Sequence, residues 1–257
     1  IGRFTITDYR ANHGVINVAE ILVYSSNKGA AAMARMAGAD TQQEFFKKLG
    51  LMDRSSIELP ESAAPLVPRH WRDANVVSAA YGYGIAISPS HLLNAVSTII
   101  GGGCKKKATL KKGGNGDIPC ERIVSPEVSK SLLQLMRYVV TYGTSSKANI
   151  PGYFVAGKTG TRDMLENGRY RKDKVSTTFI GVLGENQDKP KYIMVLLLEG
   201  PQGTKQTFGF TTAGWNAAPI SGRIMARVAM HMGLKPTKTP DRISIPFFKQ
   251  FSFKKEK

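Results

Sequence analysis

Two strand-like runs in the second half of the chain limit the fold more than any other feature of the sequence. Val175–Leu183 and Tyr192–Leu198 are both rich in residues favoured in β-strands. Only Gly184–Lys191 separates them, which is too short for the helix that a parallel crossover requires. The two runs must therefore form an antiparallel hairpin, which excludes folds built from parallel βαβ units.

The neighbouring segments extend this hairpin into a sheet that a helix closes. Tyr153–Ala156 is extended and leads into Gly157-Lys158-Thr159-Gly160-Thr161, so we expect a third strand here. Apolar periodicity predicts a final helix over Ala217–Met232. The predicted fold class is α/β of the α+β kind, with helices first, then an antiparallel sheet of at least three strands, then a closing helix.

An Ala- and Met-rich composition and several cap signals predict the helices of the first half. One helix covers Gly29–Gly38, and a second begins at a cap on Asp40 or Thr41. The proline-containing stretch after the second helix is predicted as loop. Two further helices begin where a serine N-cap precedes a proline at the first helical position, at Ser88-Pro89 and Ser125-Pro126.

The chain is strongly basic. Its 257 residues include 36 Lys and Arg against 19 Asp and Glu, a net charge of +17. This excess suits an anionic partner, although the basic residues are spread along the chain, as on a solvated surface. No predicted helix carries a basic stripe with interleaved aromatic residues, so nucleic acid is not expected as a partner. The longest apolar run, Ile193–Leu198, is too short to cross a bilayer.

The two cysteines, Cys104 and Cys120, lie in one Gly- and Lys-rich segment that we expect to be an exposed hairpin or loop. They could pair in an oxidising compartment, but we favour free thiols over a structural bridge. The sequence has neither a C-x-x-C pair nor a Cys/His spacing typical of zinc sites, so no metal site is predicted.

Gly152–Thr159 formally matches the phosphate-binding pattern G-x-x-x-x-G-K-T. That loop needs a flexible turn whose end opens a helix facing the phosphate. Here the residues between the two glycines are apolar and strand-like, and no amphipathic period follows Thr159. We therefore reject nucleotide binding at this segment.

Lys158-Thr159-Gly160-Thr161 is better suited to a strand beside an active site. A lysine ammonium attracts a substrate carboxylate, and threonine hydroxyls can donate to the same group. Gly160 removes a side chain, which lets a peptide approach the strand edge and pair with it. By itself the tripeptide is a weak signal, since a solvated lysine at a strand end would look the same.

Ser25-Ser26-Asn27, directly before a predicted helix, is a second candidate. A serine and an asparagine two positions apart present a hydroxyl and an amide from one tight turn. Such a pair can relay a proton and hold a substrate carbonyl. An ordinary helix cap uses the same residue types.

Taken together, Ser25-x-Asn27 and Lys158-Thr159-Gly160 resemble the second and third motifs of penicillin-binding proteins and serine β-lactamases. The likeness is wider than the motifs and looks like class B penicillin-binding proteins, most closely the septal, cell-division transpeptidase. The resembling blocks are Tyr24–Gly29, Gly82–Pro89, Val155–Thr161 and Ala217–Ile220. We expect residues 1–232 to be the C-terminal part of a transpeptidase domain and residues 233–257 to be a loosely held basic tail.

The resemblance implies the penicillin-binding transpeptidase fold that serine β-lactamases share, with its N-terminal portion missing. In this family the acyl-accepting serine lies in S-x-x-K upstream of S-x-N, and no serine precedes Ser25. Ser25-Ser26-Asn27-Lys28 matches S-x-x-K formally, but it coincides with the second motif, so we reject it. The nucleophile is expected upstream of this chain, and the chain alone is expected to be inactive.

By the same resemblance, the parent protein would be a serine-type D-Ala-D-Ala transpeptidase that cross-links peptidoglycan stem peptides at the septum and is acylated by β-lactam antibiotics. It would need no cofactor or metal. A transmembrane helix would anchor it at the periplasmic face of the bacterial inner membrane, among divisome membrane proteins. A β-lactamase, a penicillin sensor and a non-catalytic wall-binding protein are alternatives. The implied site comprises catalytic Ser25 and Lys158 and substrate-binding Asn27, Thr159, Gly160 and Thr161.

Overall fold

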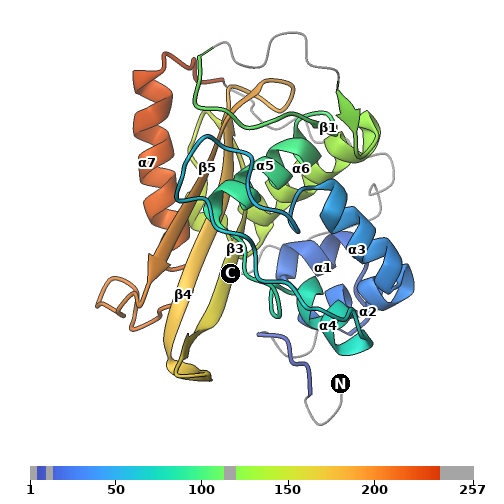
Figure 1. Cartoon of the computed structure of the whole chain (residues 1–257). Helices are drawn as coiled ribbons and strands as arrows, with labels where there is room; N and C mark the ends of the chain where they lie inside the picture. The colour runs from blue at the N-terminus through green and yellow to red at the C-terminus, as the bar shows by residue number, and fades with distance from the viewer. Residues whose placement is uncertain (1–4, 10–13, 113–119, 238–257) are drawn as a thin grey trace. The chain divides into compact units, whose positions relative to one another are not determined.

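The computed structural model describes residues 5–9, 14–112 and 120–237. The chain forms two compact units, one within residues 1–132 and the other within residues 133–257. The first unit is mainly helical, and the second contains the main sheet and the last helix (Figure 1). Among the described residues, no helix is both long enough and apolar enough to cross a membrane.

Five helices and a short two-stranded ladder make up most of the first unit. Helix α2 contacts α1, α3 and α4, while α5 contacts β1. A small core forms where Leu49, Leu51 and Ala95 are buried against Phe45 and Phe46. The elements are α1 (Val18–Tyr24), α2 (Asn27–Ala37), α3 (Ala39–Lys48), α4 (Asp73–Ala80), α5 (Pro89–Ile100), β1 (Cys104–Lys105) and β2 (Glu121–Arg122).

The serine-proline signals gave correct helix starts. Helix α5 has Ser88 as its N-cap and Pro89 at its first position, and the Ser88 hydroxyl accepts a bond from the His91 N–H. Helix α6 (Pro126–Tyr142) likewise starts directly after Ser125, whose hydroxyl accepts from the Val128 N–H. Both prolines occupy a position whose N–H would have no partner within the helix.

Other predictions for the first half were wrong. Helix α3 begins at Ala39 after Gly38, without a side-chain cap, so neither Asp40 nor Thr41 caps it. Helices α1 and α4 were not predicted. Helix α1 has only seven residues, and a capping box between Asn17 and Glu20 holds its start.

Cys104 and Cys120 form a disulfide, so the expectation of free thiols was wrong. The bond joins the two sides of the β1/β2 ladder, in which Cys104 lies opposite Arg122 and Lys105 opposite Glu121. The predicted exposed hairpin is therefore a closed loop with a short antiparallel base. Residues 113–119 within this loop lie outside the described residues.

The second unit confirms the predicted hairpin and sheet. Strands β3 (Phe154–Glu166), β4 (Arg169–Gly184) and β5 (Pro190–Glu199) form an antiparallel sheet in the order β3-β4-β5. Helix α7 (Ala217–His231) contacts β4, β5 and the short helix η1 (Ser146–Ala148), and Figure 1 shows it beside the sheet. The α/β fold class predicted from the sequence is therefore correct.

The core of the second unit lies between this sheet and α7. Val155, Phe179 and Leu183 of the sheet are buried with Met225 and Ala229 of the helix. Burying such side chains contributes about 1.5–3 kcal/mol each for the larger ones, which is the main reason for α7 to dock.

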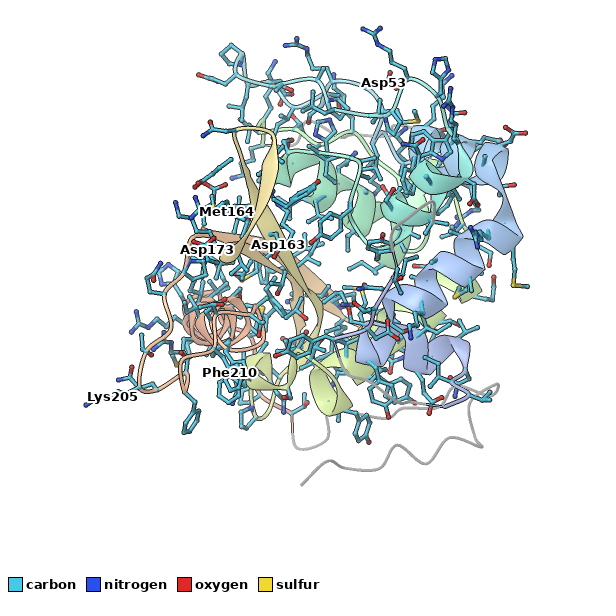
Figure 2. The ribbon with its side chains drawn as sticks, turned by 90° about the horizontal axis from the view of Figure 1, so that it is seen from below. Asp53, Asp163, Met164, Asp173, Lys205 and Phe210 are labelled. Atoms are coloured by element: carbon cyan, nitrogen blue, oxygen red, sulfur yellow. A yellow bond between two sulfur atoms is a disulfide. The ribbon has the colours of Figure 1, made fainter. Side chains whose placement is uncertain are left out.

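The β3–β4 hairpin continues as an arm beyond the part that pairs with β5. Its register shifts between Asp163, which faces Val175, and Met164, which faces Arg171, so residues 172–174 bulge out of β4. Asp163, Met164 and Asp173 mark this place in Figure 2. The arm ends at Asn167 and Gly168, both with positive φ (50° and 75°), as a tight hairpin turn requires.

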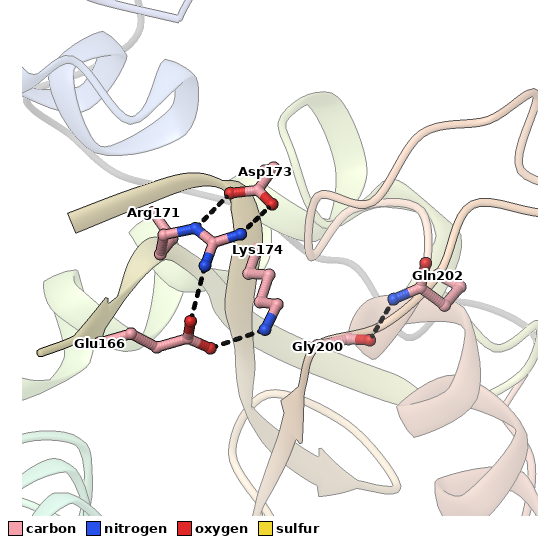
Figure 3. Close-up of polar contacts among 6 residues, drawn as sticks. All are labelled: Glu166, Arg171, Asp173, Lys174, Gly200 and Gln202. Carbon is pink, nitrogen blue, oxygen red and sulfur yellow. Dashed lines mark hydrogen bonds and ion pairs between the residues drawn. The ribbon is translucent and has the colours of Figure 1, made fainter. Parts of the chain in front are cut away.

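Ion pairs hold the bulge (Figure 3). Arg171 binds Asp173 through two nitrogens (2.8 and 2.6 Å) and Glu166 through a third (2.9 Å). Lys174 binds the other oxygen of Glu166 at 2.7 Å. The hydrogen bond from Arg171 lowers the pKa of Asp173 to about 2. These contacts link the bulge to the end of the arm, and no apolar pattern in the sequence predicts them.

The segment after α7 is held more tightly than expected. Leu234 is buried, and its carbonyl oxygen accepts from the Tyr153 hydroxyl at 3.3 Å. The Thr237 N–H donates to the Gly152 carbonyl at 2.7 Å. The prediction of a loose tail is therefore wrong for residues 233–237. Residues 238–257 lie outside the described part of the chain.

Replacing both Cys104 and Cys120 by serine should lower the free energy of unfolding by about 3 kcal/mol, the typical effect of closing a loop of this length. Urea denaturation of the oxidised protein and the double variant measures the difference. Dithiothreitol should destabilise the wild type by a similar amount and leave the variant unchanged. A variant as stable as the oxidised wild type would show that the bridge does not constrain the unfolded chain.

Candidate active site

The Ser25–Asn27 turn joins α1 to α2. Ser25 ends α1 in the left-handed conformation (φ 58°, ψ 48°), and its N–H still donates to the Leu22 carbonyl at 3.3 Å. Ser26 is buried and caps α2, accepting from the Gly29 N–H at 3.0 Å. Asn27 is the first residue of α2, whereas the sequence placed it directly before the helix. A non-glycine residue in the left-handed region costs free energy, so its surroundings must hold it there.

A segment near the start of the chain supports this turn. The Ser26 hydroxyl donates to one oxygen of Asp8 at 2.9 Å, and the Lys28 N–H donates to the other at 3.0 Å. The Asn27 amide donates to the Thr7 carbonyl at 3.0 Å, which uses one of its two N–H donors. Sequence reasoning missed Asp8, and no local pattern marks it.

Gly29 lets the two helices of this turn approach each other. A Cβ atom at Gly29 would lie 2.5 Å from Cγ1 of Ile21, closer than carbon atoms can pack. The absence of a side chain at this position therefore fixes how α2 leaves the turn. Ser25 and Asn27 are presented from a junction that the Asp8 bonds and this close packing hold together.

Lys158–Thr161 lies in the middle of β3, as predicted. Each of these four residues lies opposite a residue of β4. The register pairs are Lys158 with Ile180, Thr159 with Phe179, Gly160 with Thr178 and Thr161 with Thr177. Among the described residues β3 pairs only with β4, so it forms one edge of the sheet. No helix begins at Thr159, which agrees with the rejection of a phosphate-binding loop.

The two threonine hydroxyls are held from the same face of β3, because residues two apart in a strand share a face. The hydroxyl of Thr159 lies 2.8 Å from that of Thr144, which follows α6. The hydroxyl of Thr161 accepts from the Ala213 N–H at 3.0 Å, so its own hydrogen is available to donate elsewhere.

Asn216 positions the loop that carries Ala213. It caps α7, accepts from the Thr177 hydroxyl at 2.9 Å and donates to the Thr211 carbonyl at 2.7 Å. Sequence reasoning missed both Thr144 and Asn216. Only Asn216 carries a local signal, since an asparagine directly before a predicted helix is a common N-cap.

Lys158 has an altered acidity. Its ammonium nitrogen donates to the Thr159 carbonyl at 3.0 Å, and the residue is partly buried. Burial lowers the pKa of Lys158 to about 8, because desolvation disfavours the charged form. A lysine tuned toward neutral pH is more common at functional sites than on ordinary surfaces.

Two glycines of this strand serve different purposes. A Cβ atom at Gly157 would lie 2.5 Å from the ring of Phe179 and 2.6 Å from the Ile180 carbonyl oxygen. At Gly160 it would meet, among the described residues, only Thr178 at 3.9 Å, and Gly160 is exposed. Packing within the chain therefore requires glycine at 157 but not at 160.

The predicted site residues fall into two groups, one in each unit. The structure places Ser25 and Asn27 together in the first unit, and Lys158, Thr159, Gly160 and Thr161 together in the second. Within the described residues, no group of three or more His, Cys, Asp or Glu side chains could hold a metal ion.

An antiparallel sheet with K-T-G-T on its edge strand, in a chain with an S-x-N turn between helices, is typical of penicillin-binding proteins and serine β-lactamases. Residues 1–226 match the family described as "Penicillin binding protein transpeptidase domain". The chain belongs to this family.

Individual relatives agree with this assignment. The probable peptidoglycan D,D-transpeptidase FtsI of Caulobacter vibrioides (strain NA1000 / CB15N) is 35% identical over 243 residues, which cover 91% of this chain and 41% of the relative. The chain thus spans less than half the length of this relative.

Solved structures show the same fold. The apo transpeptidase domain of Burkholderia pseudomallei penicillin-binding protein 3 has a TM-score of 0.78 at 26% identity, covering 90% of this chain and 69% of that chain. Penicillin-binding protein 3 of Mycobacterium tuberculosis, complexed with ampicillin, has a TM-score of 0.79 at 24% identity, covering 93% and 56%. The latter likeness concerns the fold alone.

Alanine substitutions at the two glycines should separate their purposes. Gly157→Ala should lower the free energy of unfolding by about 1–3 kcal/mol, because the new methyl group has no room. Gly160→Ala should stay within about 0.5 kcal/mol of the wild type. Urea denaturation measures both. Equal losses of stability would mean that Gly160 also has a packing purpose.

Proposed function

We propose that this chain forms part of a serine-type peptidoglycan D,D-transpeptidase that cross-links stem peptides during septal wall synthesis. Membership of the penicillin-binding transpeptidase family supports this function. So does the likeness to a relative named a probable peptidoglycan D,D-transpeptidase.

The open edge of β3 at Lys158–Thr161 is the observation that carries the proposal. A stem peptide can add to this edge as a further strand, since the backbone groups there have no partner strand among the described residues. Gly160 is exposed, and no described residue packs against it closely enough to require glycine, which suits close approach by a ligand backbone.

Each site residue has a chemical task in this reaction. Lys158 supplies positive charge near the substrate carboxylate, and Thr159 and Thr161 donate hydrogen bonds to that carboxylate. Ser25 relays a proton to or from the leaving D-Ala amine, and Asn27 holds the substrate amide.

The acyl-accepting serine belongs to another part of the longer protein. Its hydroxyl, deprotonated by the lysine of S-x-x-K, attacks the D-Ala-D-Ala peptide bond, and D-Ala leaves. An amine of a second stem peptide then takes the acyl group and frees the serine. The geometry of Ser25 argues against this task, because a left-handed Ser25 outside α2 does not share a helical turn with Lys28.

The proposed setting is the periplasmic face of the bacterial inner membrane, with the parent anchored by a transmembrane helix among divisome membrane proteins. The disulfide between Cys104 and Cys120 is in keeping with an oxidising compartment such as the periplasm. β-Lactam antibiotics would acylate the parent because they imitate the D-Ala-D-Ala dipeptide.

Acylation of the full-length protein by a fluorescent penicillin tests Lys158. Lys158→Ala should slow acylation about 100-fold, as expected for loss of one preorganised charge. The wild-type rate should fall above about pH 8, because the ammonium loses its proton as the pH rises through its pKa. Lys158→Arg, slower but permanently charged, should lack this alkaline fall. A wild-type rate in the alanine variant would refute the assigned task.

Mass spectrometry of the penicillin adduct tests Ser25. In the full-length protein, Ser25→Ala should still form a covalent adduct, although more slowly, because another serine is the nucleophile. The chain of residues 1–257 alone should form none. An adduct on Ser25 in the wild-type full-length protein, or in the chain of residues 1–257, would make Ser25 the nucleophile and overturn the proposed division of tasks.

A further inference from the structure

The proposed chemistry does not involve a lysine-rich loop of the first unit. We define the lysine loop as residues 104–112, which follow α5 and include Lys105, Lys106, Lys107, Lys111 and Lys112. All but Lys105 of these lysines are exposed, and no acidic residue lies within the loop. At neutral pH this concentrates five positive charges in eight consecutive positions, Lys105 to Lys112.

The base of the lysine loop is fixed. The disulfide between Cys104 and Cys120 and the β1/β2 ladder join its first residues to the returning chain. The Arg122 guanidinium donates to the Gly102 carbonyl at 2.7 Å, directly before the loop. The Lys105 ammonium lies 3.7 Å from a carboxylate oxygen of Glu121, so this lysine forms an ion pair in the base of the loop. The other four lysines are exposed to solvent.

The far side of the lysine loop is also held. One oxygen of Glu58 accepts from the Thr109 hydroxyl at 2.7 Å, and the other accepts from the Leu110 N–H at 3.0 Å. The hydrogen bond from Thr109 is the main reason why the pKa of Glu58 falls to about 2. The carboxylate thus stays ionised and holds the loop between its two lysine clusters.

We propose that the lysine loop is a docking surface for peptidoglycan itself, as a polymer whose stem peptides carry carboxylates. This inference rests on the proposed function, since it takes the polymer that the enzyme would cross-link as the partner. A glycan strand that carries many stem peptides, each ending in a carboxylate, is a polyanion. A loop fixed at its base and middle can bind such a chain at several points with little loss of conformational entropy.

The composition of the loop favours this partner over two other polyanions. Leu110 is 62% exposed and is the single exposed large apolar side chain in residues 104–112, all of which the structure describes. Insertion into a bilayer surface would need a wider apolar face. Single-stranded nucleic acid would need aromatic rings on which bases can stack, and residues 101–122 include none.

Pelleting of the full-length protein with purified insoluble peptidoglycan tests the proposal. Replacing Lys106, Lys107, Lys111 and Lys112 together by glutamine should weaken binding about tenfold, in line with four exposed charge pairs of modest strength. A matched control removes the same charge at four exposed lysines outside the loop and should bind within about twofold of the wild type. The control lysines are Lys47, Lys130, Lys189 and Lys235.

Glu58→Ala separates a preformed docking surface from simple charge attraction. The variant is more basic than the wild type by one charge, so charge attraction alone predicts tighter binding. Loss of the two bonds to Thr109 and Leu110 instead predicts weaker binding, because the loop is no longer held. Its unfolding transition is measured alongside, since binding is interpreted only for folded protein.

Several results would overturn the proposal. They are equal losses in the loop and control variants, equal or tighter binding by folded Glu58→Ala, and undiminished binding to peptidoglycan whose carboxylates have been amidated. A loss confined to phosphatidylglycerol vesicles would identify the loop as a membrane site instead. Fluorescent penicillin labelling should be unchanged in the four-lysine variant. A failure of labelling in the wild type would count against the proposed function, whereas unchanged pelleting counts only against the docking surface.

Discussion

The register between β3 and β4 is the constraint on which the candidate site depends. Side chains alternate across a strand, so a slip by one residue would exchange the face of Lys158 with that of Thr159 and Thr161. Gly157 prevents such a slip, because only a position without a side chain fits against Phe179 and the Ile180 carbonyl. The buried Arg137 guanidinium adds a second restraint by donating to the Val155 carbonyl at 2.7 Å.

Much of the sheet could be predicted from the sequence, because its central part is apolar and strand-like. The arm from Met164 to Arg171 could not, since the ion pairs around Glu166 that accompany its strand pairing join polar side chains and leave no periodic pattern. Helix α4 could not be predicted from the sequence for a similar reason. It is eight residues long, and its first residue, Asp73, is bound by Arg35 of α2 at 2.6 Å, a contact between residues far apart in the sequence.

The motif residues of the site could be identified from residue type and order, but the residues that hold them could not. Asp8 lies 18 positions from Ser26, and Ala213 lies 52 positions from Thr161. These contacts exist only once the chain has folded, so no local signal marks them. The left-handed Ser25 is also a product of this setting, because serine has no intrinsic preference for that conformation. The sequence therefore identifies the motif residues of the site, whereas the residues that position them become visible only in the folded structure.

The same distinction applies to the lysine loop: the sequence shows its charges, and only the structure shows the contacts that fix its backbone. A count of basic residues describes a solvated surface and an organised docking surface equally well. What distinguishes them is whether the backbone that carries the charges is fixed before a partner arrives, since ordering it afterwards would offset the gain from each weak ion pair. Here Glu58, 51 positions from Thr109, and the bond from Cys104 to Cys120 supply that order. These two contacts therefore distinguish the lysine loop, as an organised basic surface, from basic residues that are merely solvated.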